Sequence, residues 1–148
     1  MLQHKAFEVV NRARDRHIRL AVTGLSRSGK TAFITALVNQ LEHAAIDGRL
    51  PLWDAQRQGR ILGARRVPQQ NAHIPTFPYE RGLDALFGDP PAWPEPTRGV
   101  AEVRLEIRYR TRHPVRRHLG EISTLYVDLV YYPGEWLLDL PLLDLSYE

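Results

Sequence analysis

Residues 24–31 have the types and the spacing needed to hold a chain of phosphate groups. They are a glycine, four variable residues, a second glycine, a lysine and a threonine. The glycines let the backbone curl until successive N–H groups point at phosphate oxygens, and a following helix adds the positive end of its dipole. Lys30 is expected to reach the β- and γ-phosphates of a nucleotide, and Thr31 to place its hydroxyl on Mg²⁺. We call residues 24–31 the phosphate-loop motif.

A strand and a helix are predicted on either side of this motif. Alternating apolar residues predict a buried strand over residues 18–22, and apolar residues at helical spacing predict a helix from Thr31 to Glu42. A short helix is predicted before them, over residues 6–16. Strand, loop and helix in this order are the context that a phosphate-binding loop requires, which favours that interpretation over a chance glycine-rich turn.

A second group of candidate residues follows another predicted strand, over residues 122–131. The N–H of Gly134 is expected to contact the γ-phosphate, and the Glu135 carboxylate to face an attacking water. Three positions before Gly134 an acidic residue should help to hold Mg²⁺, but the chain has Tyr131 there. Asp128 is a poor replacement for this acidic residue, because it lies three residues before Tyr131 along the strand, about 10 Å away and on the opposite face of the sheet. Asp128 is instead predicted to face solvent or to be paired. Having tyrosine in place of the acidic residue is expected to weaken Mg²⁺ binding and phosphoryl-transfer chemistry more than it weakens phosphate binding.

Thr97 is the candidate for a threonine that closes over Mg²⁺, because it lies just before a predicted strand; a turn-forming role is the alternative. Arg27 and Arg98 are candidates for stabilising charge on a transferring phosphoryl group, or are ordinary exposed arginines. The complete set of expected site residues is Gly24, Ser26, Arg27, Ser28, Gly29, Lys30, Thr31 and Gly134 for the nucleotide, Lys30 and Glu135 for catalysis, and Thr31 and Thr97 for the metal.

Residues 43–97 read as an irregular insertion rich in proline and aromatic residues. Eight prolines interrupt any long element, so only short helices fit, over residues 54–62 and 80–87. Clean alternation then predicts a half-exposed strand over residues 100–109, with residues 122–131 as its more buried partner. The aromatic residues predicted to anchor the insertion are Trp53, Phe77, Tyr79 and Trp93.

Composition limits the class of protein. The chain has 148 residues, 43% of them hydrophobic and 25% charged, which is typical of one globular domain. It has no cysteine, which excludes a disulfide framework, thiolate metal sites and a cysteine nucleophile, and fits a reducing cytoplasm. No apolar run approaches the roughly 20 residues that span a bilayer, so neither a signal peptide nor a membrane helix is expected.

Basic charge is concentrated in the first part of the chain. All 20 Lys and Arg residues precede residue 118, and residues 118–148 carry six acidic residues. Nucleic-acid binding is one interpretation, but an exposed strand face and turn that stay solvated, or that pair with the acidic residues of 118–148, are favoured. The arginines on which the nucleic-acid interpretation depends are Arg104, Arg108, Arg110, Arg112, Arg116 and Arg117.

The chain resembles the YcjX-like phosphate-loop NTPases of bacteria along practically its whole length. The phosphate-loop motif alone indicates only the superfamily, whereas two of the matching stretches, Trp93-Pro94-Glu95 with Thr97-Arg98-Gly99 and residues 132–141, are specific to the family. The other matching stretches are residues 23–34, 50–53, 59–64 and 77–79.

The resemblance implies a cytoplasmic, stress-associated protein with an α/β nucleotide-binding fold similar to that of small GTPases. It supports phosphate and Mg²⁺ roles for Lys30 and Thr31 and a switch role for Thr97. The family has Asp where this chain has Tyr131, and its chains are much longer. Residues 1–148 are therefore expected to be the N-terminal part of the domain, with an incomplete sheet, no base-recognition loops and a tendency to self-associate.

Two functions are consistent with these residues. The first is binding of GTP or ATP with Mg²⁺ and, in the complete protein, hydrolysis of the γ-phosphate by water near Glu135. The second is a nucleotide-binding or interaction module without hydrolysis, indicated by Tyr131 and the incomplete sheet. The choice of base and any protein partner are left open.

Overall fold

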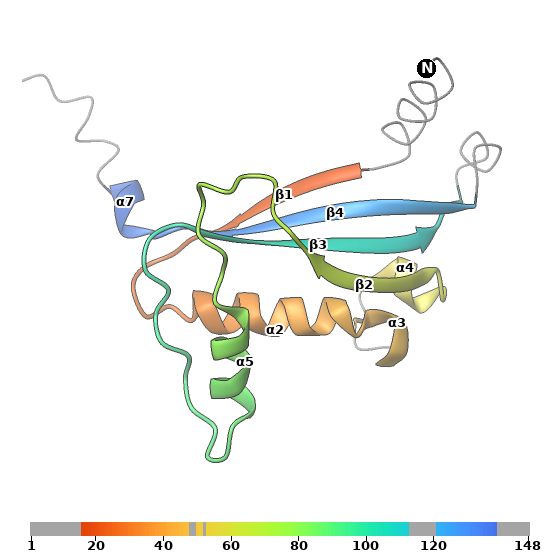
Figure 1. Ribbon diagram of the computed structural model, residues 1–148. Helices are drawn as coiled ribbons and strands as arrows, with labels where there is room; N and C mark the ends of the chain where they lie inside the picture. The colour runs from red at the N-terminus through yellow and green to blue at the C-terminus, as the bar shows by residue number, and fades with distance from the viewer. Residues whose placement is uncertain (1–15, 48–49, 52, 113–120, 139–148) are drawn as a thin grey trace, which may run out of the picture. The chain divides into compact units, whose positions relative to one another are not determined.

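A computed structural model describes residues 16–47, 50–51, 53–112 and 121–138 (Figure 1). Four strands form one sheet in the order β1-β4-β3-β2, with helices between them, which confirms the predicted mixed α/β architecture. The strands are β1 (Arg16–Val22), β2 (Ile61–Val67), β3 (Ala101–Arg110) and β4 (Ile122–Tyr131). The helices are α2 (Lys30–Glu42), α3 (Ala44–Asp47), α4 (Asp54–Arg57), α5 (Tyr79–Phe87) and α7 (Glu135–Leu138).

Strand β2 corrects the prediction of an irregular insertion over residues 43–97. It pairs antiparallel with β3, from Ile61 opposite Tyr109 to Val67 opposite Arg104, with an irregularity between Ile61 and Gly63. The helix predicted over residues 54–62 ends at Arg57, because the residues after Gly59 turn into this strand. Glycine and two adjacent arginines interrupt the apolar alternation of β2, so its periodicity gives little sign of a strand.

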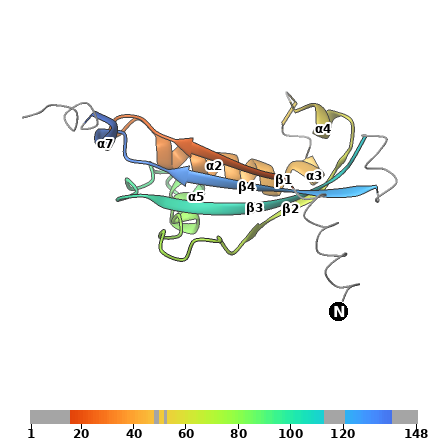
Figure 2. The ribbon, with the colours of Figure 1, turned by 90° about the horizontal axis from the view of Figure 1, so that it is seen from above.

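Strand β1 is more exposed than the sequence predicts. Ile18 and Leu20 are 44% and 47% exposed, because β1 is the last strand of the sheet that the described residues form, with β4 beside it. Figure 2 shows the two strands running side by side in the same direction. Their ends meet where the Tyr132 N–H donates to the Val22 carbonyl oxygen at 3.0 Å. Arg16 belongs to β1, and the rest of the helix predicted over residues 6–16 lies outside the described residues.

The described residues divide into two compact units. The phosphate-loop unit holds residues 20–38, 69–103 and 129–138, and the hairpin unit holds residues 16–19, 39–68 and 104–128, as far as these are described. No helix in the part of the chain that the structure describes is long and apolar enough to cross a membrane.

The core of the phosphate-loop unit forms around the first turns of α2. Ile34, Thr35 and Val38 are fully buried on this helix. Helix α5 lies beside it (Figure 1), at a contact so close that a Cβ on Gly82 would overlap the Thr35 side chain. Phe77 is buried, and its N–H donates to the Glu102 carbonyl oxygen at 2.9 Å at the start of β3.

The aromatic residues of the insertion behave differently from one another. Phe77 and Tyr79 are buried, as predicted for anchors, and Trp53 is half-buried. The prediction is wrong for Trp93, which is 78% exposed. An indole this exposed contributes little to a hydrophobic core and is available for another role.

In the hairpin unit a buried arginine lies between β1, β3 and β4. The Arg104 guanidinium lies 4.6 Å from the ring centroid of Tyr126, 3.1 Å from His17 Nδ1 and 3.7 Å from Asp128 Oδ1. Asp128 is therefore paired, although this contact is longer than a hydrogen bond. Arg104 and Glu102 are both buried, so the prediction of a half-exposed strand over residues 100–109 is wrong for the first half of β3.

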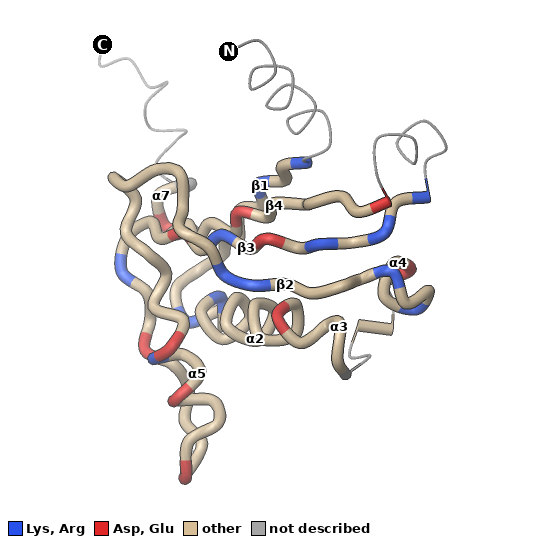
Figure 3. The backbone as a smooth tube through the Cα atoms, turned by 45° about the vertical axis from the view of Figure 1, so that its right-hand side comes forward, with Lys and Arg blue, Asp and Glu red and all other residues tan. Residues whose placement is uncertain are grey.

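Several basic residues of the hairpin unit form ion pairs with acidic neighbours. Basic and acidic segments lie close together along β2, β3 and α2 (Figure 3). Arg66 Nε is 2.9 Å from Glu42 Oε1, and Arg65 Nη2 is 3.1 Å from Glu106 Oε2. With Arg104 also paired, these contacts leave less free positive charge than the arginine content of the strands suggests.

Candidate functional site

The phosphate-loop motif connects β1 to α2 and has the backbone of a tight loop. Gly24 and Gly29 have φ angles of +149° and +85°, values that side chains disfavour and that glycine adopts without strain. Arg27 has a φ of +60°, uncommon for a residue with a side chain. The Ser28 N–H donates to the Leu25 carbonyl oxygen at 3.2 Å, which closes the turn.

Lys30 is the first residue of α2 and is held by the loop itself. Its side chain is buried, and Nζ donates to the carbonyl oxygens of Gly24 at 2.6 Å and Leu25 at 2.7 Å. An ammonium has three N–H groups, so two bonds fix its position and one remains for a ligand. The lysine is thus positioned before any ligand binds.

The start of α2 is electrostatically suited to an anion. The first N–H groups of an α-helix have no partner within the helix and carry the positive end of its dipole. The first turn of α2 contains no acidic residue that would neutralise this charge. The loop and the helix start therefore favour a negatively charged group.

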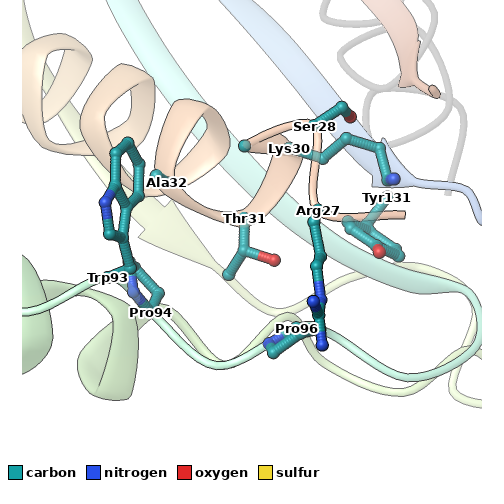
Figure 4. A pocket seen from close by; sticks show the side chains of 10 residues that line it. Arg27, Ser28, Lys30, Thr31, Ala32, Trp93, Pro94, Pro96 and Tyr131 are labelled. Atoms are coloured by element: carbon teal, nitrogen blue, oxygen red, sulfur yellow. The ribbon is translucent and has the colours of Figure 1, made fainter. Parts of the chain in front are cut away.

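A cavity of about 530 Å³ opens at this end of α2 (Figure 4). Its size is that of a site for a small organic ligand. Lys30 and Tyr131 lie together on one side of it, and Trp93 and Ala32 line the other side. The residues that line the cavity are residues 27–32, Trp93, Pro94, Pro96 and Tyr131, all within the phosphate-loop unit.

Thr31 and Thr97 meet although they are far apart in the sequence. Their hydroxyl oxygens are 3.1 Å apart, and the Thr97 N–H donates to Thr31 Oγ1 at 3.3 Å. Two adjacent ligands of an octahedral Mg²⁺, each about 2.1 Å from the ion, are separated by about 3.0 Å. The two hydroxyls form a hydrogen bond, whose length is also close to the spacing of two metal ligands. The described residues contain no group of three or more His, Asp or Glu side chains that would hold a metal without a bound ligand.

Tyr131 occupies the position at which an acidic residue is expected in a phosphate-loop protein. Its side chain is 6% exposed, and its ring centroid is 5.4 Å from Lys30 Nζ. Burial raises the pKa of the Tyr131 phenol above its usual value, and the charge of Glu135 raises this pKa further. The phenol is therefore neutral at physiological pH.

Tyr131→Phe is expected to reduce the loss of stability in alkali. Because the folded-state pKa of Tyr131 is raised above 10.0, its contribution to the free energy of unfolding is constant below about pH 10. That contribution is lost as the pH rises through the raised pKa. In thermal unfolding at pH 8 to 11, the Tm of the parent should fall more steeply than that of the variant, and parallel curves would contradict the assignment.

Gly134 and Glu135 follow β4 and lie at different depths. A Cβ on Gly134 would overlap the carbonyl oxygen of Gly24, so this glycine packs directly against the phosphate-loop motif. Glu135 is exposed at the start of α7. Neither residue lines the cavity, and neither do Gly24, Ser26 and Thr97. The roles of all the predicted site residues toward a ligand stay predictions.

Two features of the cavity were not predicted from the sequence. The ring of Tyr131 faces Lys30, a contact between residues about 100 positions apart that no local pattern reveals. Trp93 lines the cavity and is exposed, although it was predicted to anchor the insertion. The clustering of prolines around Trp93 is the one sequence signal that sets this segment apart as extended and exposed.

Comparison with known proteins decides the family. A model of the YcjX-like family (DUF463) matches residues 18–148. The chain belongs to the YcjX-like family. It is 57% identical over 146 residues to a protein named Ras-like GTPase YcjX from Escherichia coli K12. It is 47% identical over 155 residues to a protein of the same name from Shewanella oneidensis.

The family membership confirms the resemblance drawn from the sequence. Each alignment covers 99% of this chain but only 31% of the E. coli protein and 32% of the S. oneidensis protein. The chain thus spans about a third of the length of these YcjX-like relatives. The four-stranded sheet is compatible with part of a GTPase-like domain.

Proposed function

We propose that the chain binds a nucleoside triphosphate, with the phosphates in the loop formed by residues 24–31. The observation that carries this proposal is the position of Lys30, buried at the start of α2 and fixed by two loop carbonyl oxygens beside the cavity. Its remaining N–H and the free N–H groups of the helix start would bind the phosphate oxygens.

GTP is the first candidate for the nucleotide and ATP the second. The two relatives described above carry the name Ras-like GTPase, which favours guanine. In the proposed complex Thr31 and Thr97 would hold a Mg²⁺ that arrives with the nucleotide, because their hydroxyl oxygens are 3.1 Å apart. Such an ion would neutralise phosphate charge when bound.

Hydrolysis of the γ-phosphate is proposed for the complete protein, with Glu135 near the attacking water. A module that binds a nucleotide without hydrolysing it is the second candidate function. The observation in its favour is Tyr131, which puts a neutral ring where an acidic side chain is expected. Phosphate release measured with the complete protein and with a Glu135→Gln variant distinguishes the two.

Binding of the nucleotide is tested by isothermal titration calorimetry of the 148-residue chain with GTP and with ATP. The proposal predicts binding at a stoichiometry of one nucleotide per chain. A sample that unfolds cooperatively on heating, and is therefore folded, but binds neither nucleotide would overturn the proposal.

Trp93→Ala is expected to weaken nucleotide binding about 10-fold. The phosphate end of the cavity is marked by Lys30, so the nucleoside would extend toward Ala32 and the exposed indole (Figure 4). Stacking of a base on an aromatic side chain contributes about 1–3 kcal/mol. Titration with a fluorescent GTP analogue measures the loss.

The control for this variant is Phe87→Ala. Phe87 is 67% exposed in the same unit but does not line the cavity, so its removal should leave the affinity unchanged. Equal affinities for the Trp93 variant and the parent would show that the nucleoside lies elsewhere.

A further inference from the structure

Tyr131 has the geometry of a support for Lys30. The ammonium lies within the distance at which a cation is attracted to the face of an aromatic ring. The two loop carbonyl oxygens hold Nζ on one side, and the ring limits where the side chain can move on another. The interaction is stronger here than at a protein surface, because both side chains are buried.

The charge of the cavity differs from that of a site with a carboxylate at position 131. An aspartate there would offset part of the positive charge of Lys30 and attract a divalent cation. The neutral phenol does neither. Arg27 adds a second positive charge, and none of the described residues that line the cavity is acidic.

These observations indicate that the nucleotide does not need its metal in order to bind. Removing Mg²⁺ from a nucleoside triphosphate makes the phosphate chain more negative. The part of the cavity wall that the structure describes has Lys30 and Arg27 but no carboxylate, so it attracts that form strongly. On the protein side, Thr31 and Thr97 offer Mg²⁺ two neutral hydroxyls, which bind the ion weakly by themselves.

We propose that Tyr131 is a positioning residue for Lys30 and makes nucleotide binding at this site largely independent of Mg²⁺. The inference rests on the proposed nucleotide-binding function and states how that site is regulated. Mg²⁺ concentration then does not control whether the nucleotide is bound.

The test compares the affinity for a fluorescent GTP analogue in Mg²⁺ and in EDTA for the parent chain and three variants. Tyr131→Phe keeps the ring, whereas Tyr131→Asn and Tyr131→Asp remove it and differ from each other in charge. The parent and the Phe variant should bind less than about threefold more weakly in EDTA than in Mg²⁺.

The Asn and Asp variants separate the ring from the charge. Tyr131→Asn should weaken binding about 3- to 10-fold equally in both buffers, because Lys30 loses its support. Tyr131→Asp should bind at least about 10-fold more weakly in EDTA than in Mg²⁺. Thermal unfolding of each variant, with the Asn and Asp variants compared directly, tests whether the differences in affinity come from loss of the fold.

The outcomes distinguish this inference from the proposed function. If the parent binds the nucleotide at least about 10-fold more weakly in EDTA and the Asp variant has the same ratio, the inference is overturned and the binding function stands. If the Phe variant behaves like the Asn variant, the ring has no positioning role. If the folded parent binds in neither buffer, the proposed function fails as well.

Discussion

Lys30→Ala is expected to lower the affinity for GTP by about 100-fold. Hydrogen bonds to a charged group contribute about 1.5–3 kcal/mol each, and the variant loses the lysine's bond to phosphate. It also loses the two bonds that hold the carbonyl oxygens of Gly24 and Leu25, so the loop is less well ordered for the ligand. Equilibrium titration with a fluorescent GTP analogue measures the change.

The matched control for this variant is Lys5→Ala. Lys5 is the other lysine of the chain, and the same side chain is removed from a position outside the motif. It should leave the affinity as it is in the parent. A Lys30 variant that binds as tightly as the Lys5 variant would show that the phosphates are not held at the start of α2.

Gly134→Ala is expected to weaken nucleotide binding at least as much as Lys30→Ala does, and also to destabilise the fold. The new Cβ would overlap the carbonyl oxygen of Gly24, the same atom to which Lys30 Nζ donates. Either the phosphate-loop motif or the end of β4 must move, and such overpacking costs about 1–3 kcal/mol. Urea unfolding reports the loss of stability, and the GTP titration reports the displaced loop.

Gly63→Ala is the control for the glycine substitution. A Cβ at Gly63 has no atom within 4 Å and needs no unusual φ angle, so the free energy of unfolding should change by less than about 0.5 kcal/mol. Equal stability of the Gly134 and Gly63 variants would contradict the close packing of Gly134 against the loop.

The elements that were predicted correctly depend on local sequence. The helix from residue 31 to residue 42 and the loop before it follow from apolar spacing and glycine positions within about 20 residues. The bonds of Lys30 are equally local, since their acceptors lie five and six residues away. A motif can predict such contacts because chain connectivity already brings the groups together.

The features that were missed depend on distant partners. Strand β2 forms because β3 offers a row of hydrogen-bonding groups, and the burial of Arg104 depends on Asp128, His17 and Tyr126 from two other strands. Tyr131 was identified in the sequence as a departure from the expected carboxylate. Its contact with Lys30 required the structure, because only the sheet brings the end of β4 to the loop.

The most direct test of the central claim is a comparison of nucleotides that differ in the number of phosphates. Affinities of the 148-residue chain for GTP, GDP, GMP and guanosine are measured by calorimetry under one set of conditions. If residues 24–31 hold the phosphates, GTP and GDP should bind far more tightly than GMP, and guanosine should bind hardly at all. Guanosine binding as tightly as GTP would contradict the account, because the affinity would then not come from the phosphate-loop motif.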